Sequence, residues 1–233
     1  MDSIISMMKI CDYIKLLDFF KLLDDDAHVR LSAISLIHQY PKGSVLYYED
    51  DANDKIFFLV EGLLKTYKVD RCDNEIFLRY IYNNRLISEI SSLNNHEIHC
   101  YANTEFVEDS VVLEINYELF KKYFIQTGLL TDNFIEEIAN HTRELHCILN
   151  RELIFDATAR VAHMLSNNLE RFNKFKRHEV STMLNIQPET LSRILTKLKQ
   201  KNIIEFDKTD IIIIDEGQLQ NTFTGNNGLK YAE

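Results

Sequence analysis

Three side chains near the start of one predicted helix have the types and spacing needed to read DNA bases. Glu189, Ser192 and Arg193 stand at positions i, i+3 and i+4, so they share one helix face. Arginine can donate two hydrogen bonds to guanine, glutamate can accept one from cytosine N4, and serine can pair with either kind of base edge. An ordinary surface helix with an ion pair between Glu189 and Arg193 would carry the same residues. The elements around this helix therefore decide between the two interpretations.

The surrounding residues predict a winged helix-turn-helix. Residues 178–184 have a helical pattern, and after a short break a second helix is expected over 188–200, where Pro188 suits the first turn. Apolar residues recur in that second helix at spacings of three and four, as a buried stripe requires: Leu191, Ile194, Leu195 and Leu198. Two apolar stretches, 203–206 and 211–214, flank an Asp-Lys-Thr-Asp turn and predict a β-hairpin wing. The complete arrangement favours the DNA-reading interpretation.

This segment resembles the winged helix of the CRP/FNR family of bacterial transcription regulators. The run Glu189-Thr190-Leu191-Ser192-Arg193 is similar to the pattern of the FNR branch, which reads TTGAT-type half-sites, and Pro188 stands where the CRP branch usually has an arginine. The resemblance implies a regulator without enzymatic activity that binds double-stranded DNA at an A/T-rich inverted repeat. It also implies RNA polymerase as a partner if the protein activates transcription.

The chain is acidic overall but basic around this segment. The 233 residues carry a formal net charge of −10, whereas residues 171–201 contain eight lysines and arginines and two acidic residues. A local basic patch attracts the phosphates of a nucleic acid. The candidates for phosphate contact are Thr190, Lys197, Lys199, Lys201 and Arg177.

Cysteine usage and hydropathy predict a cytoplasmic protein without a membrane partner. The four cysteines are widely spaced and form no C-x-x-C pair, which is typical of a reducing compartment. The N-terminal residues lack the pattern of a signal peptide, and no apolar run reaches the length of a membrane span.

We expect an α+β fold with four parts. These are a sensor β-roll over residues 1–130, a dimerisation helix and hinge over 131–155, the winged helix-turn-helix over 156–220, and a flexible tail over 221–233. Residues 1–40 have a helical pattern. Short strands separated by Asn, Asp and Gly clusters follow up to residue 115, as in a jelly roll, and a short helix is expected over 117–124. The strand region is similar to the cyclic-nucleotide-binding-like roll of the CRP/FNR family. The similarity is greatest over residues 55–62 and 85–90. The expected strands are 45–48, 55–62, 63–69, 75–82, 99–106 and 110–115.

The long helix expected over 131–153 carries a coiled-coil seam, with apolar or small residues spaced alternately by three and four: Ile135, Ile138, Thr142, Leu145 and Leu149. This stripe could instead pack on the roll. Its combination with a DNA-binding segment favours a parallel homodimer, whose two-fold symmetry matches an inverted repeat. Phe155 and Asp156 are the predicted hinge, with Asp156 as N-cap of a helix over 157–168.

By the resemblance, an effector would bind near the junction of the roll and the long helix. In the cyclic-nucleotide-binding members, a Gly-Glu pair and an Arg-Ser pair hold the phosphate; the corresponding pairs here are Ser88-Glu89 and Cys100-Tyr101. A buried phosphate without its guanidinium partner is strongly disfavoured, so we predict that cyclic AMP is not the effector. Leu145 and His146 stand where that group has adenine-contacting hydroxyls. His141 completes the candidate effector pocket.

Three kinds of control remain open: a small metabolite, haem with a diatomic gas such as nitric oxide, or no ligand at all. Imidazole and thiolate are suitable axial ligands of haem. The candidates, each equally consistent with an ordinary surface or core residue, are His96, His99, Cys100, Tyr101, His141, His146 and Cys147. The cysteine cluster of the FNR iron–sulfur centre is absent, because the first 40 residues contain only Cys11. The sequence does not indicate which residues, if any, would bind a metal ion.

Two other functions compete with that of a DNA-binding regulator. A jelly-roll enzyme would need a nucleophile–base pair or a metal triad, and the strand region offers no motif of either kind. A ligand-binding or oligomerisation protein whose winged helix binds protein would lack affinity for DNA.

Overall fold

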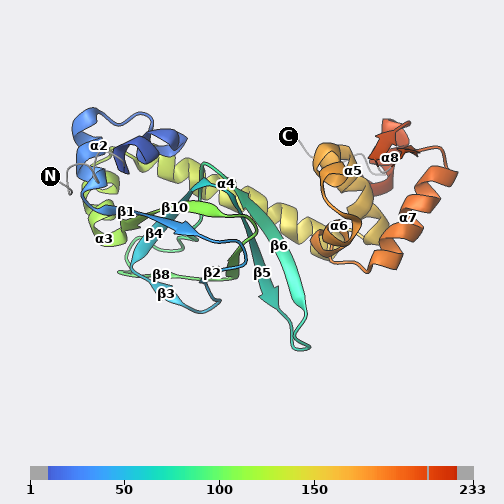
Figure 1. Ribbon diagram of the computed structural model, residues 1–233, viewed down its shortest axis with the longest axis horizontal. Coiled ribbons are helices and arrows are strands. Elements are labelled where there is room, and N and C mark those ends of the chain that lie inside the picture. Colours follow the sequence, from blue (N-terminus) through green and yellow to red (C-terminus); the bar gives the residue numbers. More distant parts are fainter. Residues whose placement is uncertain (1–9, 209, 225–233) are drawn as a thin grey trace. The chain divides into compact units, whose positions relative to one another are not determined.

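The computed structural model describes residues 10–208 and 210–224 and consists of two compact units, with the boundary between Glu144 and Leu145 (Figure 1). The first unit contains the strand-rich part and the second unit the helices of the C-terminal part. Within the described ranges, no helix is both long enough and apolar enough to span a membrane.

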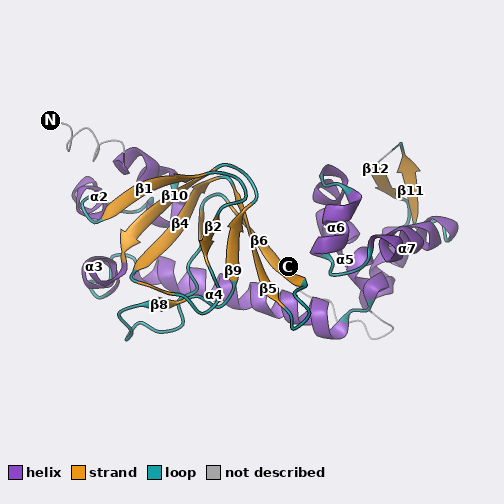
Figure 2. Ribbon diagram, turned by 60° about the horizontal axis from the view of Figure 1, so that its bottom comes forward, coloured by secondary structure: helices purple, strands orange, loops and turns teal. Residues whose placement is uncertain are grey.

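The first unit is a β-roll made of two four-stranded antiparallel sheets (Figure 2). One sheet has the order β1-β10-β4-β7: Ser35–Tyr40, Ser110–Asn116, Lys55–Glu61 and Arg85–Leu86. The other has the order β2-β9-β5-β6: Val45–Tyr47, Asn103–Phe106, Leu63–Val69 and Glu75–Tyr82. Two short strands, β3 (Ala52–Asn53) and β8 (Ile98–His99), form a separate two-stranded sheet. The expected roll is confirmed.

The expectation of a helical segment up to residue 40 is partly wrong. Residues 10–16 are helical, followed by the 3-10 turn η1 (Asp18–Phe20) and by α2 (Asp25–Ser32). Residues 35–40, however, form β1, which pairs with β10 from Ser35 opposite Ile115 to Tyr40 opposite Ser110. This distant pairing overrides the local helical pattern. Residues 1–9 of the predicted segment lie outside the described residues.

Two apolar clusters hold the roll together. One packs the helical segments against the first sheet and contains Ile14, Phe20, Phe58, Leu113, Phe120 and Phe134. The other fills the space between the sheets with residues such as Leu59, Leu64, Ile81, Phe106 and Val112. Full burial of one such side chain stabilises the fold by about 1.5–3 kcal/mol.

A long helix follows the roll. After α3 (Tyr117–Phe120) and the π-helical turn η2 (Lys121–Ile125), α4 spans Thr131–Leu149 and ends in a second π-helical turn, η3 (Asn150–Ile154). Phe134 is the buried residue of α4. The apolar seam residues remain accessible, with exposed fractions of 59% for Ile135, 39% for Ile138, 58% for Leu145 and 50% for Leu149. Thr142 is exposed as well. The seam is therefore not covered by packing on the roll.

The second unit is a winged helix-turn-helix, as expected. It contains α5 (Ala157–Lys174), α6 (Arg177–Met183), α7 (Pro188–Gln200) and the hairpin of β11 (Ile204–Asp207) with β12 (Asp210–Ile213). It ends with α8 (Glu216–Thr224), whose Leu219 is buried. Residues 221–224 are thus the last turn of a helix rather than part of a flexible tail, and residues 225–233 lie outside the described residues.

The predicted hinge residues are anchored in the second unit. Phe155 is buried, and its ring centroid lies 5.3 Å from that of His163 and 6.2 Å from that of Phe223. Arg160 donates from Nε to the Phe155 carbonyl at 3.2 Å. Asp156 is the N-cap of α5 and accepts a hydrogen bond from the Ala159 amide at 2.8 Å, which confirms the predicted cap.

Replacing Asp156 by alanine should lower the free energy of unfolding of the second unit by about 1 kcal/mol, because the Ala159 amide loses its acceptor. Asp156→Asn keeps a capping oxygen and serves as the matched control. Urea unfolding followed by circular dichroism measures both variants. Equal losses for the two variants would contradict the capping role.

Candidate nucleic-acid interface and effector site

The exposed face of α7 is fixed by the burial of its other face. Leu191, Ile194, Leu195 and Leu198 are all buried, as predicted. The helical period then directs Glu189, Ser192 and Arg193 to the outside. Within the described part of the chain, the side chains of Glu189 and Arg193 take part in no hydrogen bond or ion pair, with each other or with any other residue. Both side chains are therefore available for an external partner.

Local sequence sets where α7 begins. Asn185 adopts a left-handed conformation with φ of 50°, which asparagine tolerates better than most residues and which turns the chain out of α6. Gln187 is extended, with φ of −72° and ψ of 145°, and Pro188 occupies the first turn, where a backbone N–H would lack an intrahelical acceptor. Glu189, Ser192 and Arg193 consequently lie in the first two turns of α7.

The phosphate-contact candidates fall into two groups. Lys197, Lys199 and Lys201 are exposed, and the Lys199 ammonium lies 5.3 Å from the ring centroid of Phe206 in the wing. Thr190 is half-buried. Arg177, at the start of α6, is also half-buried, and its guanidinium carbon lies 4.8 Å from the ring centroid of Phe172. Burial lowers the pKa of Arg177, although Asp210 opposes that effect. The lysines are therefore more available to phosphates than Arg177.

The effector candidates on the roll do not form a single group. Ser88 is buried, and its hydroxyl accepts a hydrogen bond from the Phe57 amide at 2.9 Å. Cys100 belongs to the apolar cluster between the sheets, where burial raises the pKa of its thiol to about 11. Tyr101 is exposed, and its hydroxyl donates to the Ser91 hydroxyl at 2.9 Å. Leu145 and His146 are exposed on α4, beyond the boundary of the first unit.

Glu89 and His141 are brought together by a residue that the sequence prediction missed, Arg79 in β6. The Arg79 guanidinium lies 3.5 Å from the Glu89 carboxylate and forms a second ion pair with Glu144 of α4. Its side chain is only 15% exposed. Burial, with the nearby positive charge of Arg79, lowers the pKa of His141 to about 4. An arginine two residues before Ile81, which is buried between the sheets, was the available sequence signal.

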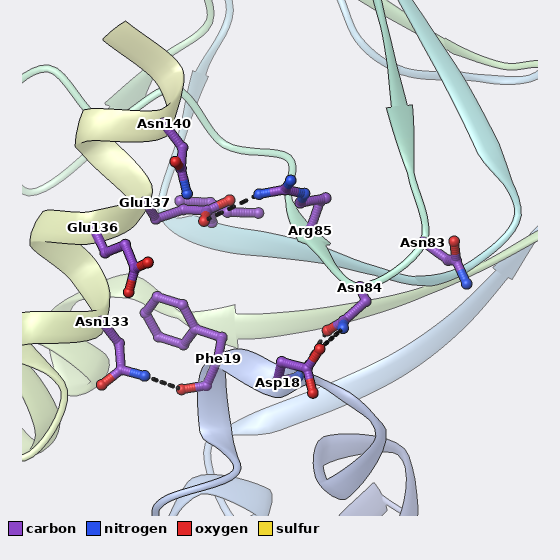
Figure 3. Close-up of a pocket in the computed structure, with 10 residues that line it drawn as sticks. Asp18, Phe19, Asn83, Asn84, Arg85, Asn133, Glu136, Glu137 and Asn140 are labelled. Atoms are coloured by element: carbon purple, nitrogen blue, oxygen red, sulfur yellow. Dashed lines mark hydrogen bonds and ion pairs between the residues drawn. The ribbon is translucent and has the colours of Figure 1, made fainter. Parts of the chain in front are cut away.

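A polar pocket of about 450 Å³ lies between η1, the turn from β6 to β7, and α4 (Figure 3). The Arg85 guanidinium faces the Glu137 carboxylate at 3.7 Å, and Asn133 donates to the Phe19 carbonyl at 3.1 Å. None of the predicted effector residues lines this pocket, but Asn140, which does, directly precedes His141 in α4. The junction of roll and helix is therefore polar over several turns of α4.

The candidate haem ligands lie in different parts of the chain, although the rings of His99 and Tyr101 are in contact, with their centroids 4.8 Å apart. His96 lies 3.3 Å from the Glu118 carboxylate and His99 lies 3.6 Å from that of Asp50, both on the exposed surface of the roll. His146 and Cys147 are exposed on α4. Across residues 10–208 and 210–224, no group of three or more His, Cys, Asp or Glu side chains is arranged to hold a metal ion.

Each of the two units contains a segment that matches a known protein-domain family. A cyclic nucleotide-binding domain matches residues 37–127, and a Crp-like helix-turn-helix domain matches residues 159–222. The anaerobic regulatory protein of Bacillus subtilis is 24% identical over 201 residues, which cover 81% of this chain and 84% of that protein. The cyclic AMP receptor protein of Thermus thermophilus is 23% identical over 169 residues, covering 71% and 77%.

The fold also resembles that of solved structures. A mutant of CooA from Carboxydothermus hydrogenoformans superimposes with a TM-score of 0.70 at 18% identity, over 88% of this chain and 94% of that one. A roll followed by a helix-turn-helix that binds DNA defines a transcription regulator. The chain belongs to the CRP/FNR family of such regulators.

The environment of His141 predicts a pH dependence of stability. His141 stays neutral in the folded state down to a pKa of about 4, whereas its ordinary value is 6.5, so the unfolded chain binds a proton first. The free energy of unfolding should therefore fall as the pH decreases from 6.5 to 4, by at most about 1.4 kcal/mol per pH unit for this one proton.

His141→Gln removes the titrating group and should make the pH profile shallower in this window only. His96→Gln, on the exposed surface, is the control. Denaturant unfolding of the first unit between pH 4 and pH 7 measures the slopes. A profile unchanged by His141→Gln would contradict the assignment.

Proposed function

We propose that the protein is a homodimeric, sequence-specific transcription regulator that binds an inverted-repeat operator through α7. We further propose that an effector other than cyclic AMP controls it at the junction of the roll and α4. The observation that carries the proposal is the exposed, unpaired set of Glu189, Ser192 and Arg193 on the helix of a DNA-binding domain. If the protein activates transcription, RNA polymerase is a further partner.

Base reading is assigned to the first two turns of α7. Arg193 would donate two hydrogen bonds to a guanine, Glu189 would accept one from a cytosine, and Ser192 would adjust to the base edge beside them. Lys197, Lys199 and Lys201 would contact phosphates and fix the register of the helix on the duplex without selecting a sequence. A preference for A/T-rich half-sites follows from the similarity of this helix to the FNR branch.

Dimerisation is assigned to α4. Four large apolar side chains, which with Thr142 are spaced alternately by three and four, are exposed in the single chain, and a second copy of α4 would cover them in a parallel coiled coil. A two-fold dimer would present two α7 helices to half-sites about one helical turn apart.

Effector control is assigned to the contact between the roll and α4. The Cys100-Tyr101 segment offers no cation for a cyclic phosphate, and the guanidinium of Arg79 is already paired with Glu89 and Glu144. An effector that altered this contact would act on α4 and, through the hinge at Phe155 and Asp156, on the two DNA-binding units. Such control needs two states of one element that differ in affinity for the effector.

Arg193→Ala should weaken binding to a selected operator by about 1–3 kcal/mol and relax the base preference at one position. Lys174→Ala removes the same charge from α5 and should weaken binding to all sequences similarly. Mobility-shift titrations measure the affinity of both variants for the operator and for operators with single base-pair substitutions. Unchanged base preference in Arg193→Ala would show that another residue reads the base.

Lys197→Ala should weaken binding to specific and random DNA alike and reduce the slope of log affinity against log salt concentration by about 1. Titrations at several salt concentrations give this slope. A loss confined to the operator would instead indicate base contact by Lys197.

Leu145→Asp should convert the dimer to a monomer, because a carboxylate in a coiled-coil seam is buried without a partner. Cys147→Asp adds the same charge on the other side of α4 and is the matched control. Sedimentation equilibrium measures the masses. A Leu145→Asp variant that remains dimeric would place the interface elsewhere.

A further inference from the structure

The polar pocket between η1, the turn from β6 to β7 and α4 is separate from the interior of the roll and from the exposed seam. Of the described residues that line it, none belongs to the apolar cluster between the two sheets. Asn133, Glu137 and Asn140 line it from α4 at positions i, i+4 and i+7, which share one helix face. By the helical period, the seam from Ile135 to Leu149 occupies nearly the opposite face. A second copy of α4 on the seam would therefore leave the pocket open.

The lining of this pocket is acidic. Glu136 and Glu137 of α4 and Asp18 of η1 supply three carboxylates. The one positively charged side chain among the described residues that line the pocket is Arg85. Asp18 is already paired at 3.0 Å with Lys21, which is not part of the lining. The two carboxylates of α4 are thus left with a single guanidinium between them.

The Glu137 carboxylate is largely buried but poorly satisfied. Its side chain is 12% exposed, and its ion-pair partner, the Arg85 guanidinium, lies 3.7 Å away, beyond hydrogen-bond distance. Across the described ranges, no residue forms a hydrogen bond with this carboxylate. Buried carboxylates are nearly always hydrogen-bonded. A carboxylate that instead lines a pocket points to a bound hydrogen-bond donor.

The groups around Glu137 are acceptors and an aromatic ring (Figure 3). The amide of Asn140 has no hydrogen-bond partner within the described part of the chain. Asn133 donates its amide N–H to the Phe19 carbonyl at 3.1 Å, which leaves its amide oxygen as an acceptor. The Phe19 ring lines the same pocket, and the face of an aromatic ring attracts cations. Carboxylates, amide oxygens and an aromatic ring together suit an ammonium group, which donates three hydrogen bonds.

The size of the pocket favours an organic cation over a metal ion. Its volume of about 450 Å³ is in the range of small-molecule sites. Residues 10–208 and 210–224 also contain no group of three or more His, Cys, Asp or Glu side chains arranged to hold a metal ion.

We propose that this pocket binds a small aliphatic diamine or polyamine, with one ammonium group hydrogen-bonded to Glu137 and the carbon chain packed against Phe19 and Leu86. The ligand would contact three segments that are distant in sequence, namely η1, the turn from β6 to β7, and α4. It would thereby fasten the N-terminal segment of the first unit to α4. This site is independent of the proposed DNA-binding function and of the proposed effector.

The test measures binding by isothermal titration calorimetry, with full-length, DNA-free protein at constant ionic strength. The probes are 1,4-diaminobutane and spermidine, and at least one of them should bind in a saturable manner. Magnesium chloride and butane-1,4-diol, a cation without N–H donors and an uncharged chain of similar length, should bind at least tenfold more weakly. The absence of saturable binding by both amines would overturn the proposal, as would equal binding of magnesium or of the diol.

Glu137→Gln should weaken binding of the effective amine about tenfold or more, because it removes a charge-assisted hydrogen bond. Asp132→Asn is the matched control, since Asp132 is an exposed carboxylate in the first turn of α4 that does not line the pocket. Equal weakening in the two variants would reduce the effect to general electrostatics and overturn the proposal.

Arg85→Gln should change the affinity in the opposite direction. The variant leaves the Glu137 carboxylate without its ion-pair partner, so its first unit should melt at a lower temperature than that of the wild type in the absence of amine. The effective amine should bind this variant more tightly and restore the melting temperature. Weakening of amine binding by Arg85→Gln to the same extent as by Glu137→Gln would contradict competition between guanidinium and ammonium and overturn the proposal.

Asn140→Leu obstructs the pocket without removing a hydrogen bond that the described residues form. Its melting temperature without amine should equal or exceed that of the wild type, which separates loss of binding from loss of folding. Amine binding should be lost. An Asn140→Leu variant that binds the amine as tightly as the wild type would place the amine elsewhere on the protein and overturn the proposal.

Discussion

Burial of the apolar stripe of α7 is the constraint on which the functional surface depends. Leu191, Ile194, Leu195 and Leu198 must face the interior of the second unit, and the helical period then leaves no freedom for the side chains between them. Glu189, Ser192 and Arg193 are thereby held outward on a rigid element. The lysines that follow share the exposed side, so the residue types for base reading and for phosphate contact lie on one surface.

In the first unit, the pairing register of the strands imposes a comparable constraint. The pairing of β6 with β5 and of β5 with β9 places Arg79, Thr66 and Thr104 side by side inside the roll. The resulting cation cannot stay unpaired in a largely buried position, and Glu89 and Glu144 supply the compensating charge. Because Glu144 belongs to α4, the same ion pair connects the roll to the helix that carries the exposed apolar seam.

Local signals explain what could be predicted from the sequence. The apolar period of α7, Pro188 at its start and the capping carboxylate of Asp156 all act within one or two helical turns, and each was found in the structure as predicted. The assignments that depend on distant partners were less accurate. Strand β1 exists because it pairs with β10, and the partner of Arg79 on α4 is 65 residues away. No spacing rule connects residues so far apart.

Selection of bound fragments from random double-stranded DNA, followed by sequencing, tests the central claim most directly. The account predicts enrichment of an A/T-rich inverted repeat whose half-sites are about one helical turn apart, with a conserved G·C pair in each half-site that Arg193→Ala no longer selects. Fragments without a common motif, or a motif that Arg193→Ala leaves unchanged, would contradict the account.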